Sequence, residues 1–196
     1  MDCVKKLIHF FYPTYCLHCN GPLQSPRHHL CLSCFEQMEW IDPTLRCPSC
    51  YGTLPCPHCH KKPKKGSHLS LFEGFGPILS LYHHFLKRGE GTPLAALLLY
   101  KWSQTLWPKP DLIVPATWRF FPKKDPSYLL CQAVARLFRL PLALPKKRFE
   151  GKRILLITSE LKSFEELKQM KAMAMSCFPL ELHSLSLIDS RGSSTE

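Results

Sequence analysis

The chain has 196 residues, of which 45% are hydrophobic, and a formal net charge of +11. This length allows one small and one medium-sized folding unit, and the absence of any run of 18 apolar residues excludes a membrane-spanning helix. The basic balance is compatible with a nucleic-acid or phosphate partner, and a solvated lysine-rich surface explains it equally well.

The first segment, residues 4–12, carries apolar side chains at helical spacing with Lys5 and Lys6 between them. It predicts a short amphipathic helix that ends at Pro13 and packs on one of the two units, with membrane contact as the alternative. We expect no export signal, because no small-residue cleavage site follows the apolar run. A chain that stays in the cytoplasm keeps its thiols reduced, which favours metal binding over disulfides.

Four Cys-x-x-Cys pairs follow within 44 residues: Cys16 and Cys19, Cys31 and Cys34, Cys47 and Cys50, Cys56 and Cys59. Two pairs supply the four sulfurs of a structural zinc site, so the spacing predicts a double zinc ribbon with two ions. Sequential pairing is the favoured arrangement, an interleaved cross-brace is the alternative, and disulfides are the competing chemistry. Glycine follows each leading pair, in Asn20-Gly21 and Tyr51-Gly52, and predicts a positive-φ turn there.

A basic linker, residues 61–67, separates this N-terminal unit, residues 1–60, from the rest of the chain. Its charge and its proline are typical of a domain boundary. The segment is either a solvated hinge or a stripe that contacts phosphates. The candidate nucleic-acid residues in it are Lys61, Lys62, Lys64 and Lys65.

In residues 68–189, short continuous runs of apolar residues alternate with segments whose apolar residues recur at helical spacing. Strands are predicted at 69–72, 111–115, 153–158 and 180–188, and helices at 77–87, 92–106, 127–138 and from 163 onward. Thr92 and Ser127 are the expected N-caps, Ser163 and Glu166 form a capping box, and Leu130, Val134, Leu137 and Phe138 form a core stripe. The pattern predicts an α/β domain with a parallel sheet, followed by a disordered tail at 190–196.

The order of these parts resembles the ComF family, nearly from end to end. The motifs that carry the resemblance are Phe11-Tyr-Pro13, Cys16-Leu-His-Cys19, Cys31-Leu-Ser-Cys34 before Trp40, Cys47-Pro-Ser-Cys50, Phe75-Gly-Pro77, His83, Lys87-Arg-Gly89, Asp111-Leu-Ile-Val-Pro115 and Arg153-Ile-Leu-Leu-Ile157. The resemblance implies a zinc ribbon fused to a type I phosphoribosyltransferase-like domain. It also implies a link to natural competence, in which the family is thought to assist imported single-stranded DNA in the cytoplasm.

The chain departs from the family after the strand 153–158. There the family carries an Asp-Asp-Val-x-Thr-Thr-Gly loop, whose carboxylates hold the ribose of phosphoribosyl pyrophosphate and whose amides cradle its 5′-phosphate. The carboxylate positions fall on Thr158 and Ser159, and the Thr-Thr-Gly positions on Lys162, Ser163 and Phe164. Glu165 and Glu166 add negative charge nearby, and Glu160 supplies one acid only if the loop shifts by one residue.

A second family loop is also altered. After the strand 111–115 the family carries an arginine-rich loop ending Gly-Phe-Asn-Gln, and this chain has a shorter loop without that glycine and glutamine. Arg119, Lys123 and Lys124 retain positive charge, and Trp118, Phe120 and Phe121 offer rings for base stacking or for ordinary packing.

These departures indicate a degenerate phosphoribosyltransferase site, and no catalytic triad, Walker loop or dinucleotide fingerprint offers another chemistry. We expect a ComF-like accessory protein in DNA uptake, without catalytic residues, that binds single-stranded nucleic acid or a competence or helicase-type protein partner. The alternatives are an active Mg²⁺-dependent phosphoribosyltransferase and a zinc-ribbon adaptor that docks another protein.

Overall fold

A computed structural model describes residues 14–25, 28–47, 49–56, 67–116, 125–144 and 148–191. Several of the features expected from the sequence lie outside the described residues. They are the amphipathic helix at 4–12, Cys59, the linker lysines Lys61, Lys62, Lys64 and Lys65, the loop with Trp118, Arg119, Phe120, Phe121, Lys123 and Lys124, and the end of the tail at 192–196.

The four strands form one parallel sheet in the order β1-β4-β3-β2, which confirms the predicted α/β class. They are β1 (His68–Glu73), β2 (Leu112–Pro115), β3 (Arg153–Leu161) and β4 (Glu181–Asp189). Nearly every strand residue is buried, as expected for a parallel sheet covered on both faces. Strand β3 continues three residues beyond its predicted end at Thr158 and pairs with β4 as far as Leu161.

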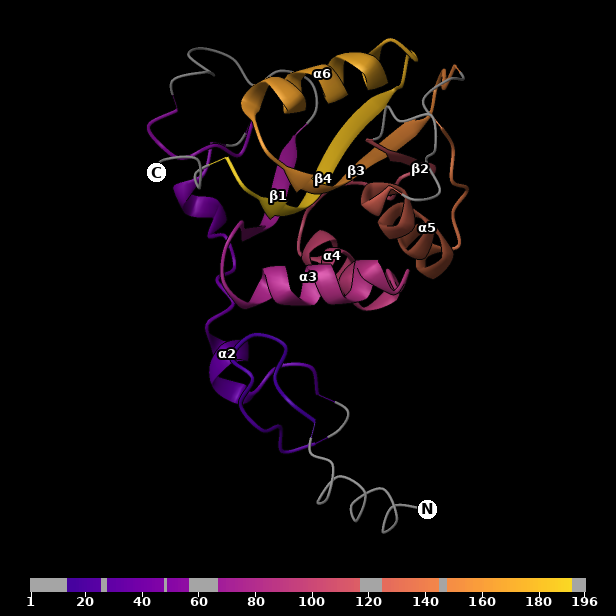
Figure 1. Ribbon diagram of the computed structural model, residues 1–196. Coiled ribbons are helices and arrows are strands. Elements are labelled where there is room, and N and C mark those ends of the chain that lie inside the picture. Colours follow the sequence, from indigo (N-terminus) through magenta and orange to yellow (C-terminus); the bar gives the residue numbers. More distant parts are fainter. Residues whose placement is uncertain are drawn as a thin grey trace.

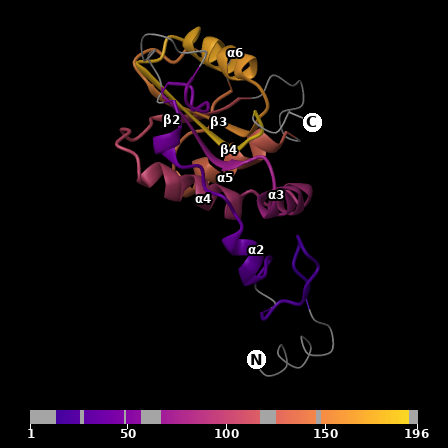
Figure 2. The ribbon, with the colours of Figure 1, turned by 90° about the vertical axis from the view of Figure 1, so that its left-hand side faces the viewer.

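Helices cover both faces of the sheet (Figures 1 and 2). One face carries α3 (Pro77–Lys87), α4 (Thr92–Ser103) and α5 (Pro126–Phe138), and the other carries α6 (Phe164–Met175). The cysteine-rich segment contributes only the short helix α2 (Leu32–Glu36) and the 3₁₀ turn η1 (Pro43–Leu45). It reaches from the side of α3 to the free edge of β1, where the N–H of Ile41 donates to the carbonyl of Leu71 over 2.9 Å.

The direction of winding reverses between β2 and β3. After α5 the chain forms a parallel bridge between Leu142 and Ile113 on the outer side of β2, so this crossover runs outward. After β3 the chain crosses through α6 to β4, which lies on the opposite side. In open α/β sheets, ligands bind at the carboxyl ends of strands where the winding reverses. The ends of β2 and β3 are therefore the expected place for a site.

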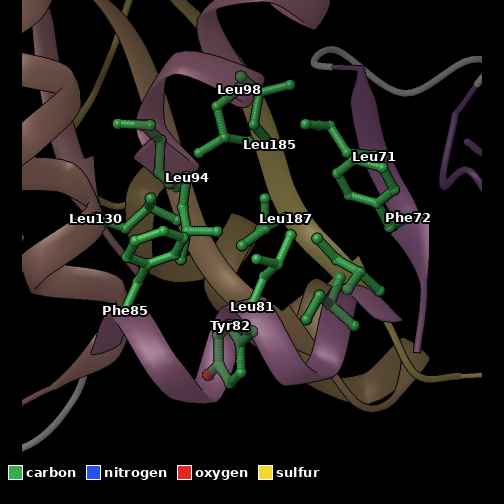
Figure 3. Close-up of a cluster of buried hydrophobic side chains, with 14 of the residues drawn as sticks. Leu71, Phe72, Leu81, Tyr82, Phe85, Leu94, Leu98, Leu130, Leu185 and Leu187 are labelled. Carbon is green, nitrogen blue, oxygen red and sulfur yellow. The ribbon is translucent and has the colours of Figure 1, made fainter. Parts of the chain in front are cut away.

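The main core fills the space between the sheet and the layer of α3, α4 and α5 (Figure 3). Leu94 and Leu98 of α4 and Leu130 of α5 meet Leu185 and Leu187 of β4, and all five are buried. The predicted core stripe of α5 is wrong at Leu137, whose side chain is 44% exposed. Leu137 lies in the last turn of α5, one residue before the helix ends at Phe138.

Helix caps agree with the sequence at α6 and differ at α4 and α5. Ser163 caps α6 as predicted, since its hydroxyl accepts the N–H of Glu166 over 3.0 Å. Helix α4 is preceded by Gly91 and has no side-chain cap at Thr92, contrary to prediction. In α5 the cap is Asp125, whose carboxylate accepts the N–H groups of Ser127 and Tyr128. The predicted Ser127 cap is wrong, and the Ser127 hydroxyl bonds to β3 instead.

Candidate functional site

The cysteines gather into two clusters that could hold metal ions. In the first, the Sγ atoms of Cys16, Cys19, Cys31 and Cys34 all lie within 4.8 Å of one another. The Cys19 and Cys31 sulfurs are 3.7 Å apart. A tetrahedral zinc ion with bonds of about 2.3 Å requires sulfurs about 3.8 Å apart, whereas a disulfide requires about 2 Å. The four thiols are free and fit a metal site.

The second cluster joins Cys47, Cys50 and Cys56, whose sulfurs satisfy the same 4.8 Å limit. The Cys50 and Cys56 sulfurs are 3.5 Å apart. Cys59, the predicted fourth ligand, lies outside the described residues. Among the cysteines that the structure describes, the grouping is sequential and not interleaved.

Both clusters begin with the same backbone turn. The N–H of Cys16 donates to the carbonyl of Gly21 over 2.8 Å, and the N–H of Cys47 donates to the carbonyl of Gly52 over 2.8 Å. The positive φ angles belong to Asn20 (58°) and Tyr51 (59°), so the predicted role of the glycines is wrong. A Cβ at Gly21 would lie 3.3 Å from the Cys19 sulfur, so a side chain at this position would crowd that sulfur.

The turn also prepares the leading thiol of each cluster to bind a cation. Burial raises the pKa of Cys16, but hydrogen bonding to the backbone of Cys19 and neighbouring residues outweighs this and lowers its pKa to about 6. The pKa of Cys47 falls to about 7 for the same reasons. Burial and the neighbouring thiols raise the pKa of Cys34 to about 12. Metal binding favours thiolates, so a bound cation would remove the Cys34 proton.

A pocket of about 400 Å³ lies at the carboxyl ends of β2 and β3, where the winding reverses. Its lining comes from α3, the ends of both strands and the first turns of α5 and α6. The residues are Tyr82, Ala116, Asp125, Pro126, Ser127, Thr158, Ser159, Glu160, Lys162 and Glu166. The structure therefore brings together four of the residues predicted for the altered phosphoribosyl pyrophosphate loop, namely Thr158, Ser159, Glu160 and Lys162.

The pocket floor is a network of hydroxyl groups from three elements. The Ser127 hydroxyl lies 3.1 Å from that of Ser159 and 3.4 Å from that of Thr158, and the Tyr82 hydroxyl donates to Ser159 over 3.2 Å. Ser127, Thr158 and Ser159 are all buried, and burial raises the pKa of Tyr82. Hydroxyl groups therefore form this part of the pocket lining.

The carboxylates around the pocket are already engaged within the chain. Glu166 accepts the backbone N–H of Lys162 over 2.8 Å, and Asp125 caps α5. Glu160 accepts the Ser190 hydroxyl over 2.8 Å with one oxygen and lies 3.6 Å from the Lys162 ammonium with the other. All three carboxylates line the pocket, and each already accepts a hydrogen bond from within the chain.

The remaining predicted loop residues, Ser163 and Phe164, begin α6 beside the pocket and do not line it. Sequence reasoning missed Tyr82 and Asp125, which lie on other elements and carry no local signal for a site. It also assigned Ser190 and Arg191 to a disordered tail, and this is wrong, since both side chains make hydrogen bonds within the fold.

No protein-family model matches the sequence, and no curated protein matches it. Similar solved structures include the alanine mutant from an analysis of an invariant aspartic acid in HPRTs, with 14% identity and a TM-score of 0.37 over 57% of this chain and 70% of that chain. Hypoxanthine phosphoribosyltransferase from Trypanosoma cruzi, in complex with the product IMP, has 17% identity and a TM-score of 0.36 over 56% of this chain and 64% of that chain. Similarity at this level says nothing about activity. None of the described helices is both long enough and apolar enough to cross a membrane.

Proposed function

We propose that this chain is a ComF-like cytoplasmic accessory protein that binds single-stranded nucleic acid and does not transfer phosphoribosyl groups. In this proposal two zinc ions hold the cysteine-rich segment in shape, and the α/β domain is a phosphoribosyltransferase-like scaffold. The linker lysines and the basic loop at 119–124 supply the contacts to the nucleic-acid backbone. The winding reversal at the pocket and the resemblance of the sequence to the ComF family both support this proposal.

The observation that carries the proposal is the hydrogen bond from the Lys162 N–H to the Glu166 carboxylate, over 2.8 Å. Helix N-termini bind phosphate because their first N–H groups have no partner within the helix. Here the chain's own carboxylate takes the N–H that precedes the helix. At about 4 Å, two unit charges repel by about 4 kcal/mol at an effective dielectric of 20, so a phosphate beside Glu166 is strongly disfavoured.

The hydroxyl floor supports the same conclusion. The ribose hydroxyls of phosphoribosyl pyrophosphate need strong acceptors, and ionised carboxylates provide them. Thr158 and Ser159 offer neutral, buried hydroxyls that are already engaged: the Thr158 hydroxyl donates to the carbonyl of Glu160, and the Ser159 hydroxyl accepts from Tyr82. The ribose hydroxyls of a ligand would have to displace these internal hydrogen bonds, and they would gain only hydrogen bonds to neutral hydroxyls, which are weaker than bonds to carboxylates.

Isothermal titration calorimetry tests whether the chain lacks a binding site for phosphoribosyl pyrophosphate. Phosphoribosyl pyrophosphate and Mg²⁺ are titrated into the full zinc-loaded chain, and we expect no saturable heat at micromolar ligand. Single-strand binding by the same sample serves as the check that the protein is folded and competent. Saturable micromolar binding of phosphoribosyl pyrophosphate would overturn the proposal in favour of an active Mg²⁺-dependent enzyme.

Fluorescence anisotropy with a labelled single-stranded oligonucleotide tests the binding role. We expect the logarithm of the affinity to fall linearly with the logarithm of salt concentration, by about 0.7 for each phosphate contacted. Replacing the four linker lysines by alanine should weaken binding. The matched control replaces four exposed lysines elsewhere, which are Lys87, Lys109, Lys152 and Lys168. Equal weakening by both variants, or affinity that does not change with salt, contradicts the proposed interface.

A protein-docking adaptor is the second candidate, because α2 exposes two large apolar side chains. Leu32 is 68% exposed and Phe35 is 57% exposed. An adaptor's partner would remain bound after nuclease treatment and would be lost from a variant with Leu32→Ser and Phe35→Ser. Leu106→Ser is the control, since that side chain is fully exposed on the α/β domain. Release of the partner by nuclease would instead support the nucleic-acid role.

A further inference from the structure

The second cysteine cluster receives charged hydrogen-bond donors from the α/β domain. The Lys171 ammonium on α6 donates to the carbonyl of Ser49 over 3.1 Å. The Arg191 guanidinium, two residues after β4, donates to the carbonyls of Cys50 over 2.9 Å and Tyr51 over 3.1 Å. Three consecutive carbonyls of the metal-binding turn are therefore held by two cations that lie far away in the sequence.

Arg191 is itself fixed in place. Its Nε donates to Oδ1 of Asp189 over 2.8 Å, and its Nη2 contacts the other oxygen of the same carboxylate. Asp189 is 2% exposed and also accepts the Ser70 hydroxyl over 3.1 Å. A paired carboxylate of this kind sets the orientation of a guanidinium fork. The remaining N–H groups of Arg191 are therefore held in a fixed orientation toward the carbonyls of Cys50 and Tyr51.

The first cluster has no equivalent support. The corresponding carbonyls belong to His18, Cys19 and Asn20, and no lysine or arginine side chain in the described part of the chain donates to them. The first turn meets α3 through the His18 ring, whose Nδ1 lies 3.3 Å from the Ser80 hydroxyl. The two clusters share a turn geometry and differ in what surrounds that turn.

This difference matters because the total negative charge of the thiolates exceeds the positive charge of the ion that they bind. Three or four thiolates around one divalent cation leave a net negative site, which nearby positive charge stabilises. Groups that orient the metal ligands from outside typically change metal affinity by about 10-fold to 100-fold when they are removed. Lys171 supplies positive charge, and both Lys171 and Arg191, whose own charge is paired with Asp189, orient the backbone on each side of Cys50.

We propose that Lys171 and Arg191 are positioning residues of the second metal site. The second site is then a joint product of the cysteine-rich segment and the α/β domain, whereas the first receives no charged donor from the described part of that domain. Zinc in the second site would tie the two parts of the chain together. This inference rests on the metal-binding role of the cysteines and not on the nucleic-acid role, so either can fail without the other.

The test measures zinc binding by the full chain with a competing chromophoric chelator. A Cys19→Ser background disables the first site, so the second is observed alone. We expect Arg191→Met and Lys171→Met each to weaken zinc binding there by about 10-fold or more. In a Cys47→Ser background, where only the first site remains, the same changes should have no effect. Lys168→Met is the matched control, since Lys168 lies on α6 and pairs with Glu165 at the surface.

Cobalt distinguishes positioning from general stabilisation. With Co²⁺ in place of zinc, the visible absorption of the second site reports its tetrahedral geometry, and we expect it to change in both variants. If Arg191→Met does not fold, Arg191→Lys replaces it, because lysine keeps the positive charge but cannot donate to both carbonyls. Lys171→Met also tests the proposal independently of position 191. Unchanged zinc affinity and an unchanged cobalt spectrum in the folded variants, with only a lower unfolding temperature, would overturn the proposal.

Discussion

The backbone N–H of Ser159 donates a hydrogen bond to the hydroxyl oxygen of Ser127 over 3.0 Å. This bond joins the first turn of α5 to the end of β3 at the point where the sheet reverses its winding. Both residues are buried, and the same Ser127 oxygen lies 3.1 Å from the Ser159 hydroxyl. A single serine thus supports both the backbone and the side chain of Ser159.

Removal of that hydroxyl should destabilise the domain. Ser127→Ala leaves the buried N–H of Ser159 without a partner, and such a loss costs about 1–3 kcal/mol. Urea denaturation followed by circular dichroism measures the change in the free energy of unfolding. Ser176→Ala is the control, since Ser176 is exposed and its hydroxyl bonds only to the nearby carbonyl of Met173. An equal effect of the two variants would show that the buried network adds nothing.

The capping carboxylate of α6 should contribute to stability and not to ligand binding. Glu166→Gln removes the negative charge near the start of α6 but keeps an amide oxygen that can accept the Lys162 N–H, so we expect a loss of about 0.3–1 kcal/mol. Glu165→Gln is the matched control in the same turn, because Glu165 is exposed and pairs only with Lys168. Neither variant should bind phosphoribosyl pyrophosphate, since Thr158 and Ser159 remain. Binding by Glu166→Gln would mean that one charge alone closes an otherwise working site.

Metal content should follow the two clusters. We expect about two zinc ions per chain by elemental analysis, since the first cluster provides four sulfurs and the second provides three, with Cys59 as its predicted fourth ligand. Cys47→Ser should lower the content to about one ion, because it removes a ligand from the second cluster only. Cys177→Ser is the control, because Cys177 is buried beside α6 and belongs to neither cluster. Zinc-free protein that keeps its full stability would contradict a structural role for the metal.

Acid should destabilise the α/β domain through His68. Burial, followed by the nearby charges of Arg191 and Lys171, holds the pKa of His68 well below 6.5. Below about pH 6.5, His68 is therefore protonated in the unfolded chain but stays neutral in the folded chain until the pH reaches its lower folded pKa. Stability is complete above that pH and falls, as pH decreases toward the folded pKa, by up to about 1.4 kcal/mol per pH unit.

The measurement compares unfolding free energies between pH 7.5 and pH 5 for the native chain and for His68→Gln, with zinc in excess. The variant should lose less stability over this range, because glutamine does not titrate. His28→Gln is the control, since His28 is exposed. If His68→Gln shows the same pH dependence as the native chain, His68 is not the group responsible. Metal release at low pH affects all three proteins and cancels in the comparison.

Local patterns in the sequence were sufficient to predict the two cysteine clusters and most of the elements. The Cys-x-x-Cys spacing predicts zinc ligands because two thiolates three positions apart reach one ion across a tight turn. The strands were recognisable because a buried parallel strand is a continuous apolar run, as at 111–115 and 153–158. The Ser163 cap of α6 was recognisable because its hydroxyl and the Glu166 N–H lie within one helical turn. The other half of the predicted capping box differs, since the Glu166 carboxylate accepts the N–H of Lys162 and not that of Ser163.

The tertiary structure alone decided what surrounds those local features. The pocket floor joins Tyr82, Ser127 and Ser159 from three elements, and the second metal-binding turn is held by Lys171 and Arg191 from more than 100 positions away. Such contacts depend on the order and winding of the strands, which residue spacing does not encode. Periodicity reports which face of a segment is buried, and only the packed fold determines which distant side chain meets it.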